Sequence, residues 1–545
     1  MTVIATFLLL ISIIGWSSLI ADTGKLTLPQ AAFTVMAGMG CFMMMAFLAQ
    51  IPNYAARVFI DGGLFAFPCA LIFRKHSNGF MATINRYLRV FFIMAGLIGG
   101  LSLLVSGIQF GSIDDYSFWG TISRFLFVFN HLPENASLIK ASFLQYTPGL
   151  ACFHYLFYQM AGQYSPMLNY LAQDLILLAP LLLLFDEKYR WRSISYMMLV
   201  IITLYLAYGN ILAKLEVDAA VALWFFSMIW VASRPNQISI WVMIVGLVFL
   251  SIIKEIGLLF SFFVLGVHYV CYRKQPGQLP RLFILSSALL LMKLAWLSHV
   301  HQFGFTSFAA KISVSNAISS MIPGNPDYVK SQVMFVKALL SSNFDHTIKL
   351  PFAALFILAG WQIHRLYRLG RLQSNHLVVI KAFYILLPFY ILNLYWLQAI
   401  VFRVGYLQSH LLDFPRYFNM AFVPFLLSVL FVSLETKPFR NPEKVKRLAT
   451  ALSMIALVFI VGGKIERTKK YYHPFDFTNL AEKIQSQTHN LKQSKAICLT
   501  HLPSPDYQVL LPLQYRFMPR QIIHVDSKNT KTCGKVFDFA ELRGD

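Results

Sequence analysis

Long apolar stretches recur along most of this 545-residue chain, and they constrain its fold more than any other feature. A window of about eighteen or more mainly apolar residues is long enough to cross a hydrocarbon core of roughly 30 Å. The sequence contains about fourteen such windows by this criterion. A lipid-exposed backbone must satisfy its own hydrogen bonds, and the runs lack the short alternation of barrel strands, so the spans are expected to be helices.

The composition excludes an ordinary soluble protein, because 57% of the residues are hydrophobic, only 13% are charged and the mean hydropathy is +0.59. The predicted fold is an all-α polytopic membrane bundle of about fourteen transmembrane helices with a small α/β C-terminal extracytoplasmic domain. Residues 1–465 form the predicted bundle, which includes an external loop at 109–165, and residues 466–545 form the soluble domain.

The net charge of +22 indicates the orientation of the spans in the membrane rather than nucleic-acid binding, because Lys and Arg concentrate in short loops between the spans. The five basic clusters are Arg74 to Arg89, Lys188 to Arg192, Arg273 to Arg281, Arg365 to Arg371 and Lys437 to Arg447. If all five face the cytoplasm, the spans alternate without conflict. The chain is then a multi-pass protein of the cytoplasmic (inner) membrane, with the 111–165 region, the region near Asp218 and the C-terminal tail outside.

The tail is polar and carries three β-like runs, "AICLTHL", "YQVLLPL" and "QIIHVD", separated by Pro, Ser and Asp. Cys498 and Cys533 both lie in it. Two cysteines in an oxidising compartment are able to form a disulfide, and the sequence leaves both the bridge and two free thiols open.

Two adjacent carboxylates, Asp114 and Asp115, directly follow an early span. Charge at that depth is costly unless it serves a function. The apolar residues of the following Tyr116–Phe129 segment recur at helical spacing, which predicts an interfacial helix on the outer surface. The alternative role for the aspartates is structural, because Asp often caps a helix that begins just after it.

Further polar residues fall on the predicted outer side. They are Tyr146 and His154 on either side of a Pro-Gly turn, Glu216 and Asp218 in "LEVDAA", and the cations Lys254, Arg403 and Arg416. Each also has a simpler interpretation. Lys254 could pair with Glu255 or extend to the interface, Arg403 could anchor a helix end, and Arg416 could contact lipid headgroups.

This arrangement resembles the GT-C superfamily of polytopic membrane glycosyltransferases, which use polyprenyl-phosphate sugars and are related to protein mannosyltransferases and aminoarabinose transferases. The sequence Asp114-Asp115-Tyr116-Ser117 is similar to the D-E-[FY]-[ST] form of some bacterial members, and Tyr146-Thr147-Pro148-Gly149 is similar to a Y-P-P-G turn. A later acidic site and a soluble external domain follow in the expected order. The chain departs from the pattern in its extra early spans and in Asp115, where Glu is common.

The resemblance implies an inverting transfer from a polyprenyl-phosphate sugar donor to a cell-envelope acceptor, which is a lipid, a glycan or a protein. Asp114 or Asp115 would then be the general base. Arg416, Lys254 and Arg403 would stabilise the leaving phosphate, and Tyr146, His154, Glu216 and Asp218 would contact substrate. Glu216 and Asp218 would orient the acceptor or bind a divalent cation. Besides the two substrates, membrane lipid is the expected partner.

Two other classes of function stay open at this stage. A polysaccharide polymerase or ligase would share the lipid-linked substrate. An arginine-rich constellation in a large external loop would favour that class, and the 300–349 region contains none. A lipid flippase or transporter would predict two similar halves with broken helices, and the sequence has no evident half-repeat.

Overall fold

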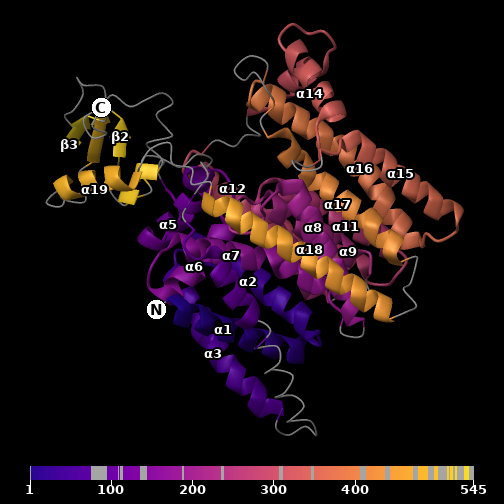
Figure 1. The fold of residues 1–545 in the computed structure, drawn as a ribbon, viewed down its shortest axis with the longest axis horizontal. Coiled ribbons are helices and arrows are strands. Elements are labelled where there is room, and N and C mark those ends of the chain that lie inside the picture. The colour runs from indigo at the N-terminus through magenta and orange to yellow at the C-terminus, as the bar shows by residue number, and fades with distance from the viewer. Residues whose placement is uncertain are drawn as a thin grey trace.

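The structure, a computed structural model, describes most of the chain. The described residues are 2–74, 92, 95–108, 110, 114–134, 144–186, 189–234, 239–305, 311–344, 349–404, 411, 413–435, 442–469, 477–488, 496–500, 512–514, 516–518, 522–524 and 533–538. Residues 109, 111–113 and 135–143 of the predicted external loop therefore lie outside the described residues. What is described is a helical bundle with a small sheet near the C-terminus (Figure 1).

The first half of the bundle runs from α1 to α10. Its elements are α1 (Thr2–Gly24), α2 (Leu28–Leu48), α3 (Pro52–Arg74), the π-helix η1 (Asp115–Trp119), α5 (Gly120–Phe129), α6 (Gly149–Ala161), α7 (Pro166–Leu178), the 3-10 helix η2 (Ala179–Leu184), α8 (Arg190–Tyr208), α9 (Asp218–Ala232) and α10 (Ile240–Ile253). The second half comprises α11 (Ile256–Tyr272), α12 (Gln278–Gln302), α13 (Val314–Met321), α14 (Val329–Ser341), α15 (Phe352–Arg368), α16 (Ser374–Trp396), the π-helix η5 (Leu397–Val401), α17 (Phe414–Glu435) and α18 (Pro442–Lys469).

Eight described helical segments are long and apolar enough to cross a membrane. They are Ile4–Ala21, Leu28–Leu48, Pro166–Leu184, Arg190–Tyr208, Gln278–Gln302, Ser374–Val401, Phe414–Glu435 and Pro442–Ile465. Four shorter apolar helices accompany them, at Ala95–Val105, Asp218–Ala232, Ile240–Ile253 and Ile256–Tyr272. The prediction of a multi-pass helical membrane protein is confirmed, while the count of about fourteen spans stays a prediction.

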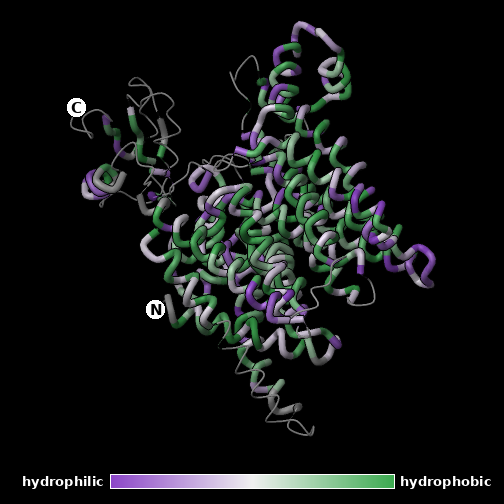
Figure 2. The backbone as a smooth tube through the Cα atoms, turned by 45° about the vertical axis from the view of Figure 1, so that its right-hand side comes forward, coloured by the Kyte–Doolittle hydropathy of each residue, from purple (hydrophilic) through white to green (hydrophobic). Residues whose placement is uncertain are grey.

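Helix α9 forms the centre of the bundle, because every one of its residues is buried. It packs against α7, α10, α11 and α17. The outer helices α12 and α18 instead expose large apolar side chains, among them Phe283, Leu291 and Val458, which suits contact with lipid tails. Hydrophobic residues run through the length of the bundle, and hydrophilic residues gather near helix ends (Figure 2).

Small residues allow α1 and α3 to approach closely. A Cβ on Gly63 would lie 2.1 Å from the hydroxyl oxygen of Ser12, and one on Gly15 would lie 2.0 Å from the Gly63 carbonyl oxygen. The Trp16 indole N–H donates across the same contact to the Phe59 carbonyl, at 2.8 Å. Such close backbone packing is how helices associate where lipid removes the hydrophobic driving force.

The bundle has a polar region at each of its two ends, where hydrogen bonds and ion pairs join the ends of neighbouring helices. At one end the Asn375 amide donates to the Ser233 carbonyl (2.9 Å) and to the Tyr272 hydroxyl (3.3 Å), which joins the ends of α9 and α11 to the start of α16. Arg234 pairs with Glu435 there. We call this the basic end. The opposite end contains the starts of α9 and α17, and we call it the acidic end.

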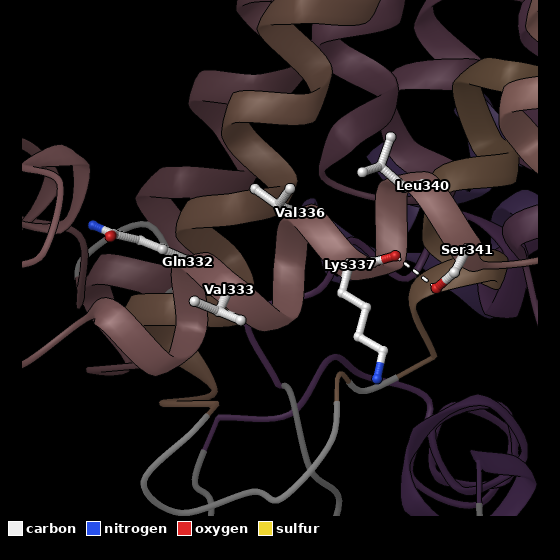
Figure 3. Close-up of a pocket in the computed structure, with 6 residues that line it drawn as sticks. All are labelled: Gln332, Val333, Val336, Lys337, Leu340 and Ser341. Atoms are coloured by element: carbon white, nitrogen blue, oxygen red, sulfur yellow. Dashed lines mark hydrogen bonds between the residues drawn. The ribbon is translucent and has the colours of Figure 1, made fainter.

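Helices α13 and α14 project from the rest of the bundle (Figure 1). Helix α14 exposes Val333, Val336 and Leu340 beside a shallow hollow. Val336 and Leu340 point to one side of the helix and Lys337 to the other (Figure 3). Val333 is also exposed and lies on the Lys337 side, so α14 presents a mixed apolar and basic surface, although the predicted spans do not include it.

The predicted interfacial helix is only partly correct. Residues 115–129 are helical, but α5 buries Ile122, Phe125 and Leu126 against α6. The apolar face that the sequence assigns to the membrane surface is thus covered by the protein itself.

The tail contains α19 (Phe477–Thr488) and a parallel sheet of β1 (Ala496–Thr500), β2 (Ile522–His524) and β3 (Cys533–Asp538) in the order β2-β1-β3. Its own small core includes Ile484, Ile497 and Phe537. The runs beginning at Ala496 and Gln521 contain strands as predicted, but residues 512–513 at the end of the middle run are helical, and β3 was not predicted. Arg124 of α5 donates to the Arg516 carbonyl at 3.2 Å and so joins the tail to the acidic end.

Cys498 and Cys533 form a disulfide between β1 and β3, so one of the two outcomes that the sequence left open is realised. Cys41, Cys69, Cys152 and Cys271 are free. We expect alkylation of the denatured, unreduced protein to modify only these four of the six cysteines. Reduction before alkylation should add two adducts in the intact-mass spectrum. Modification of all six cysteines without reduction would contradict the bridge.

Candidate functional site

Charged side chains from four separate segments meet at the acidic end. Asp114 directly precedes η1, Asp218 is the first residue of α9, and Arg416 lies in the first turn of α17. Lys254 occupies the break between α10 and α11, where its backbone is extended. Glu216 lies two residues before α9. We call these five residues the Arg416 cluster.

Arg416 is the centre of the cluster. Its Nη1 atom lies 2.9 Å from Asp114 Oδ2 and 3.8 Å from Glu216 Oε1, and its Nε lies 3.1 Å from Asp218 Oδ2. Asp413 approaches the same Nη1 at 3.5 Å from an exposed position. The Nε–H is not aligned to donate a hydrogen bond, so the contact with Asp218 is an ion pair without one. One guanidinium therefore connects three chain segments.

Lys254 forms the second cationic contact of the cluster, because its Nζ donates to Asp218 Oδ1 at 2.5 Å. Asp218 is 2% exposed, and an isolated carboxylate at that depth would be strongly unfavourable. Both of its oxygens face a cation, which satisfies the charge. The ammonium of Lys254 and the guanidinium of Arg416 also lie 5.0 and 5.2 Å from the Tyr417 ring centre. Asp218 is thus the ion-pair partner of Lys254 in place of Glu255.

The break that places Lys254 has a local cause. Helix α11 begins so close to the end of α10 that a Cβ on Gly257 would lie 1.9 Å from the Leu250 carbonyl oxygen. Only glycine fits this approach without movement of the backbone. The interruption turns the Lys254 side chain toward α9 and gives a lysine to an otherwise apolar helix pair.

The two neighbouring aspartates have different environments. The side chain of Asp114 is 31% exposed and accepts a hydrogen bond from Arg416. Asp115 is 1% exposed and accepts one from the Tyr170 hydroxyl of α7 at 3.0 Å. The N-cap alternative is wrong for Asp114, whose side chain makes no capping hydrogen bond to η1. The π-helix η1 begins between the two aspartates, so that the Asp114 carboxylate is accessible and the Asp115 carboxylate is buried.

Glu216 lies at the edge of the cluster, and Tyr146 borders it. Glu216 lies 3.7 Å from Lys214, and burial raises its pKa against the opposing effect of Lys214 and Arg416. Tyr146 stacks on Trp119 with ring centres 6.0 Å apart. Burial, helped by nearby acidic groups, raises the pKa of Tyr146 well above its usual value. The phenol therefore stays protonated and is able to donate a hydrogen bond.

Four of the predicted site residues are not among the five of the cluster: Asp115 and Tyr146, described above, and His154 and Arg403. His154 is buried between Ser123 (3.3 Å) and Gln173 (3.2 Å), where it links α5, α6 and α7. Arg403 has an exposed side chain, and among the described residues no hydrogen bond or ion pair connects it to a carboxylate of the Arg416 cluster. His154 has a clear structural role, and Arg403 stays a prediction.

Sequence reasoning did not identify the partners that complete the site, which are Tyr170, Lys214, Asp413 and Tyr417. Asp413 and Tyr417 flank Arg416 in "DFPRY", so the motif itself contained a signal for them. Tyr170 is 55 residues from Asp115 inside an apolar helix, where no local pattern distinguishes it. Within the described ranges, no three His, Cys, Asp or Glu side chains are arranged to hold a metal ion. The carboxylates of the cluster surround cationic side chains instead.

Comparisons with known proteins identify no relative for this chain. No family model matches it, and neither the curated proteins nor the solved structures contain a match.

Proposed function

We propose that this protein is a membrane glycosyltransferase that moves a sugar from a polyprenyl-phosphate donor to a cell-envelope acceptor at the outer face of the membrane. The Arg416 cluster carries the proposal. It combines an accessible carboxylate, Asp114, with two cations, Arg416 and Lys254, at one end of a membrane bundle. Glycosyl transfer from a lipid phosphate needs a base for the acceptor hydroxyl and positive charge for the leaving group.

In this proposal Asp114 is the general base. The acceptor hydroxyl attacks the anomeric carbon as its proton passes to the Asp114 carboxylate. The bond between that carbon and the phosphate oxygen breaks, and polyprenyl phosphate leaves with the electron pair, which inverts the anomeric centre. Asp115 is too deeply buried to meet an acceptor, so its role is to hold the turn against Tyr170.

Arg416 and Lys254 are the groups that would stabilise the departing phosphate. Both are held by Asp218, whose two oxygens face one cation each. Fixed cations of this kind need little reorganisation as negative charge develops on the phosphate. Glu216 and Tyr146 lie at the border of the site, where a carboxylate and a phenol could orient the hydroxyls of a sugar.

An apolar groove that includes part of the α8–α9 connection supports a lipid-linked donor. The groove has a volume of about 590 Å³ and lies between the Ala95–Val105 helix, α8 and α18. Ile211 and Leu212 line it just before the loop that carries Glu216 and Asp218. Lys464 and Ser453 also line it and provide one cation and one hydroxyl within the apolar wall. A chain of isoprene units matches the apolar walls of this groove.

The interior of the bundle favours an enzyme over a transporter. Below Asp218, α9 is almost entirely apolar, and Phe225 stacks on Phe260 at 4.3 Å and contacts Phe383 at 5.8 Å. These rings fill the centre between the two polar ends. The proposal includes about fourteen spans in the inner membrane, with the acidic end and the C-terminal domain outside.

Asp114→Asn tests the base directly. Asn keeps an oxygen for Arg416 but does not take up a proton, so turnover should fall by a factor on the order of 10²–10⁴. The measurement is sugar transfer from a purified polyprenyl-phosphate donor, with the enzyme in nanodiscs.

Asp413→Asn is the matched control, because Asp413 also approaches Arg416 but its side chain is 60% exposed. An exposed pair contributes little, so this variant should stay within about twofold of wild type. Asp115→Asn keeps an oxygen for Tyr170 and should lose far less activity than Asp114→Asn. Full transfer by a correctly folded Asp114→Asn enzyme would show that the mechanism is wrong.

The orientation of the two ends is tested by cysteine labelling in a Cys69→Ser background. Ser313→Cys lies beyond α12 on the side of the acidic end, and Ser374→Cys begins α16 at the basic end. Both positions are exposed. A membrane-impermeant maleimide applied to sealed cells should label the first and should label the second only after permeabilisation. The reverse pattern would place the Arg416 cluster in the cytoplasm and remove the basis for an outer-face reaction.

A further inference from the structure

The hairpin of α13 and α14, which projects from the bundle in Figure 1, exposes an apolar stripe on each of its helices. The stripes consist of Val314, Ile318 and Met321 on α13 and of Val329, Val333, Val336 and Leu340 on α14. Residues three or four positions apart lie on one face of a helix, and the exposed fractions of these side chains range from 37% to 77%. We call them the hairpin stripes. The proposed transfer reaction uses none of their residues.

The opposite face of α14 holds the hairpin at the acidic end. Phe335 is buried there, and its ring centre lies 5.3 Å from that of Tyr395 in α16 and 5.4 Å from that of Phe414 in α17. The Tyr395 hydroxyl also donates to the Ser320 carbonyl of α13. Both α16 and α17 belong to segments that are long and apolar enough to cross the membrane, and these contacts are made at or near their ends. The hairpin therefore lies at the level of the membrane boundary.

Helix α15 connects the hairpin to the lipid-facing surface of the bundle. It packs against α14 and reaches the basic end, where Gln362 donates to the Ser433 hydroxyl of α17 at 3.1 Å. Ile357 and Leu358 of α15 are 70% and 56% exposed. Exposed apolar side chains between the two ends of a membrane bundle contact lipid tails. The α14 stripe therefore adjoins a surface that faces lipid.

Basic side chains accompany the hairpin stripes. Residues 311–344 contain three lysines, Lys311, Lys330 and Lys337, and one carboxylate, Asp327. Lys337 lies beside Val336 in sequence and extends from the border of the α14 stripe (Figure 3). A lysine in this position keeps its methylene groups against apolar surface while its ammonium reaches the headgroups. An apolar stripe with flanking lysines is typical of a helix that lies in the interface of an anionic membrane.

We propose that the α13–α14 hairpin anchors the chain in the membrane leaflet at the acidic end and binds anionic phospholipids there. The hairpin stripes enter the boundary between headgroups and acyl chains, and the ammonium groups of Lys330 and Lys337 contact the negatively charged headgroups. A second copy of this chain fits the surface less well, because its net charge of +22 would repel the lysines. The inference does not depend on the transfer reaction or on the side of the membrane that the acidic end faces.

Photocrosslinking of the full-length protein in nanodiscs tests which molecule covers the stripes. Benzoylphenylalanine, which forms a covalent bond to a nearby C–H group on irradiation, replaces Val336 or Ile318 in separate variants. Both positions should give peptides that carry one phospholipid. The matched control is Asn316, which is exposed two positions before Ile318 and so lies on another face of α13, and it should give far less lipid adduct. Val458 of α18, exposed on a membrane span, is the positive control.

The headgroup preference is measured with the Val336 probe in nanodiscs that contain equal amounts of dioleoylphosphatidylglycerol and dioleoylphosphatidylcholine. These lipids have the same acyl chains and differ in net charge, which is the variable that the proposal concerns. Phosphatidylglycerol should predominate in the adducts, and Lys337→Gln should lower its ratio to phosphatidylcholine by about fivefold, the contribution of one lysine near an anionic surface. Lys337→Arg keeps the charge and should keep the ratio. Lys274→Gln removes an exposed lysine at the basic end and should leave the ratio unchanged.

Four outcomes would overturn the proposal. A Val336 probe without a lipid adduct, where the Val458 probe gives one, would show that lipid does not cover α14. Equal lipid adducts at Asn316 and Ile318 would show that the α13 stripe does not orient the hairpin in the membrane. A crosslinked product of twice the chain mass would assign the stripes to a second copy. The same lipid ratio with and without Lys337→Gln would remove the binding of anionic headgroups.

Discussion

The ion pairs around Arg416 are the interaction on which the acidic end depends. A charge near the membrane interior is tolerated only when it is paired and hydrogen-bonded, and removal of one partner leaves the others exposed to the full cost of desolvation. Arg416 contacts Asp114 across 302 residues of sequence, and the same guanidinium also reaches Asp218 at the start of α9. The positions of η1, α9 and α17 are therefore coupled by one side chain, and Lys254 adds the α10–α11 break to the same network.

The two polar ends are independent because an apolar helix separates them. Helix α9 begins at Asp218 in the Arg416 cluster and ends near Arg234 at the basic end, and the residues between are buried and almost all apolar. A polar ligand at one end therefore has no polar route to the other. The chemistry proposed at Asp114 can therefore be tested without disturbing the basic end.

The membrane character and the polar tail were predictable, because both follow from local composition. The partners inside the site were not. Lys254 has Glu255 beside it in sequence, yet its charge is balanced by Asp218 from 36 residues away, since the helix break turns the lysine toward α9. His154 occurs in a turn region typical of a binding loop, yet it holds three helices together. Periodicity identifies which face of a helix is buried, but the neighbour of that face depends on the packing of distant segments.

The geometry around Nη1 of Arg416 explains how Asp114 could act as a base without loss of the fold. That single atom lies within 3.8 Å of oxygens from Asp114, Asp413 and Glu216, and Nε faces Asp218. If Asp114 takes up a proton, its attraction to the guanidinium weakens, but three other carboxylates still hold the cation in place. The charges of the site must hold the guanidinium in place and must also supply a base, and different carboxylates meet these two requirements. Asp218 is buried and holds both cations in place, while Asp114 lies at the accessible side of the same guanidinium, where the proposed acceptor would meet it.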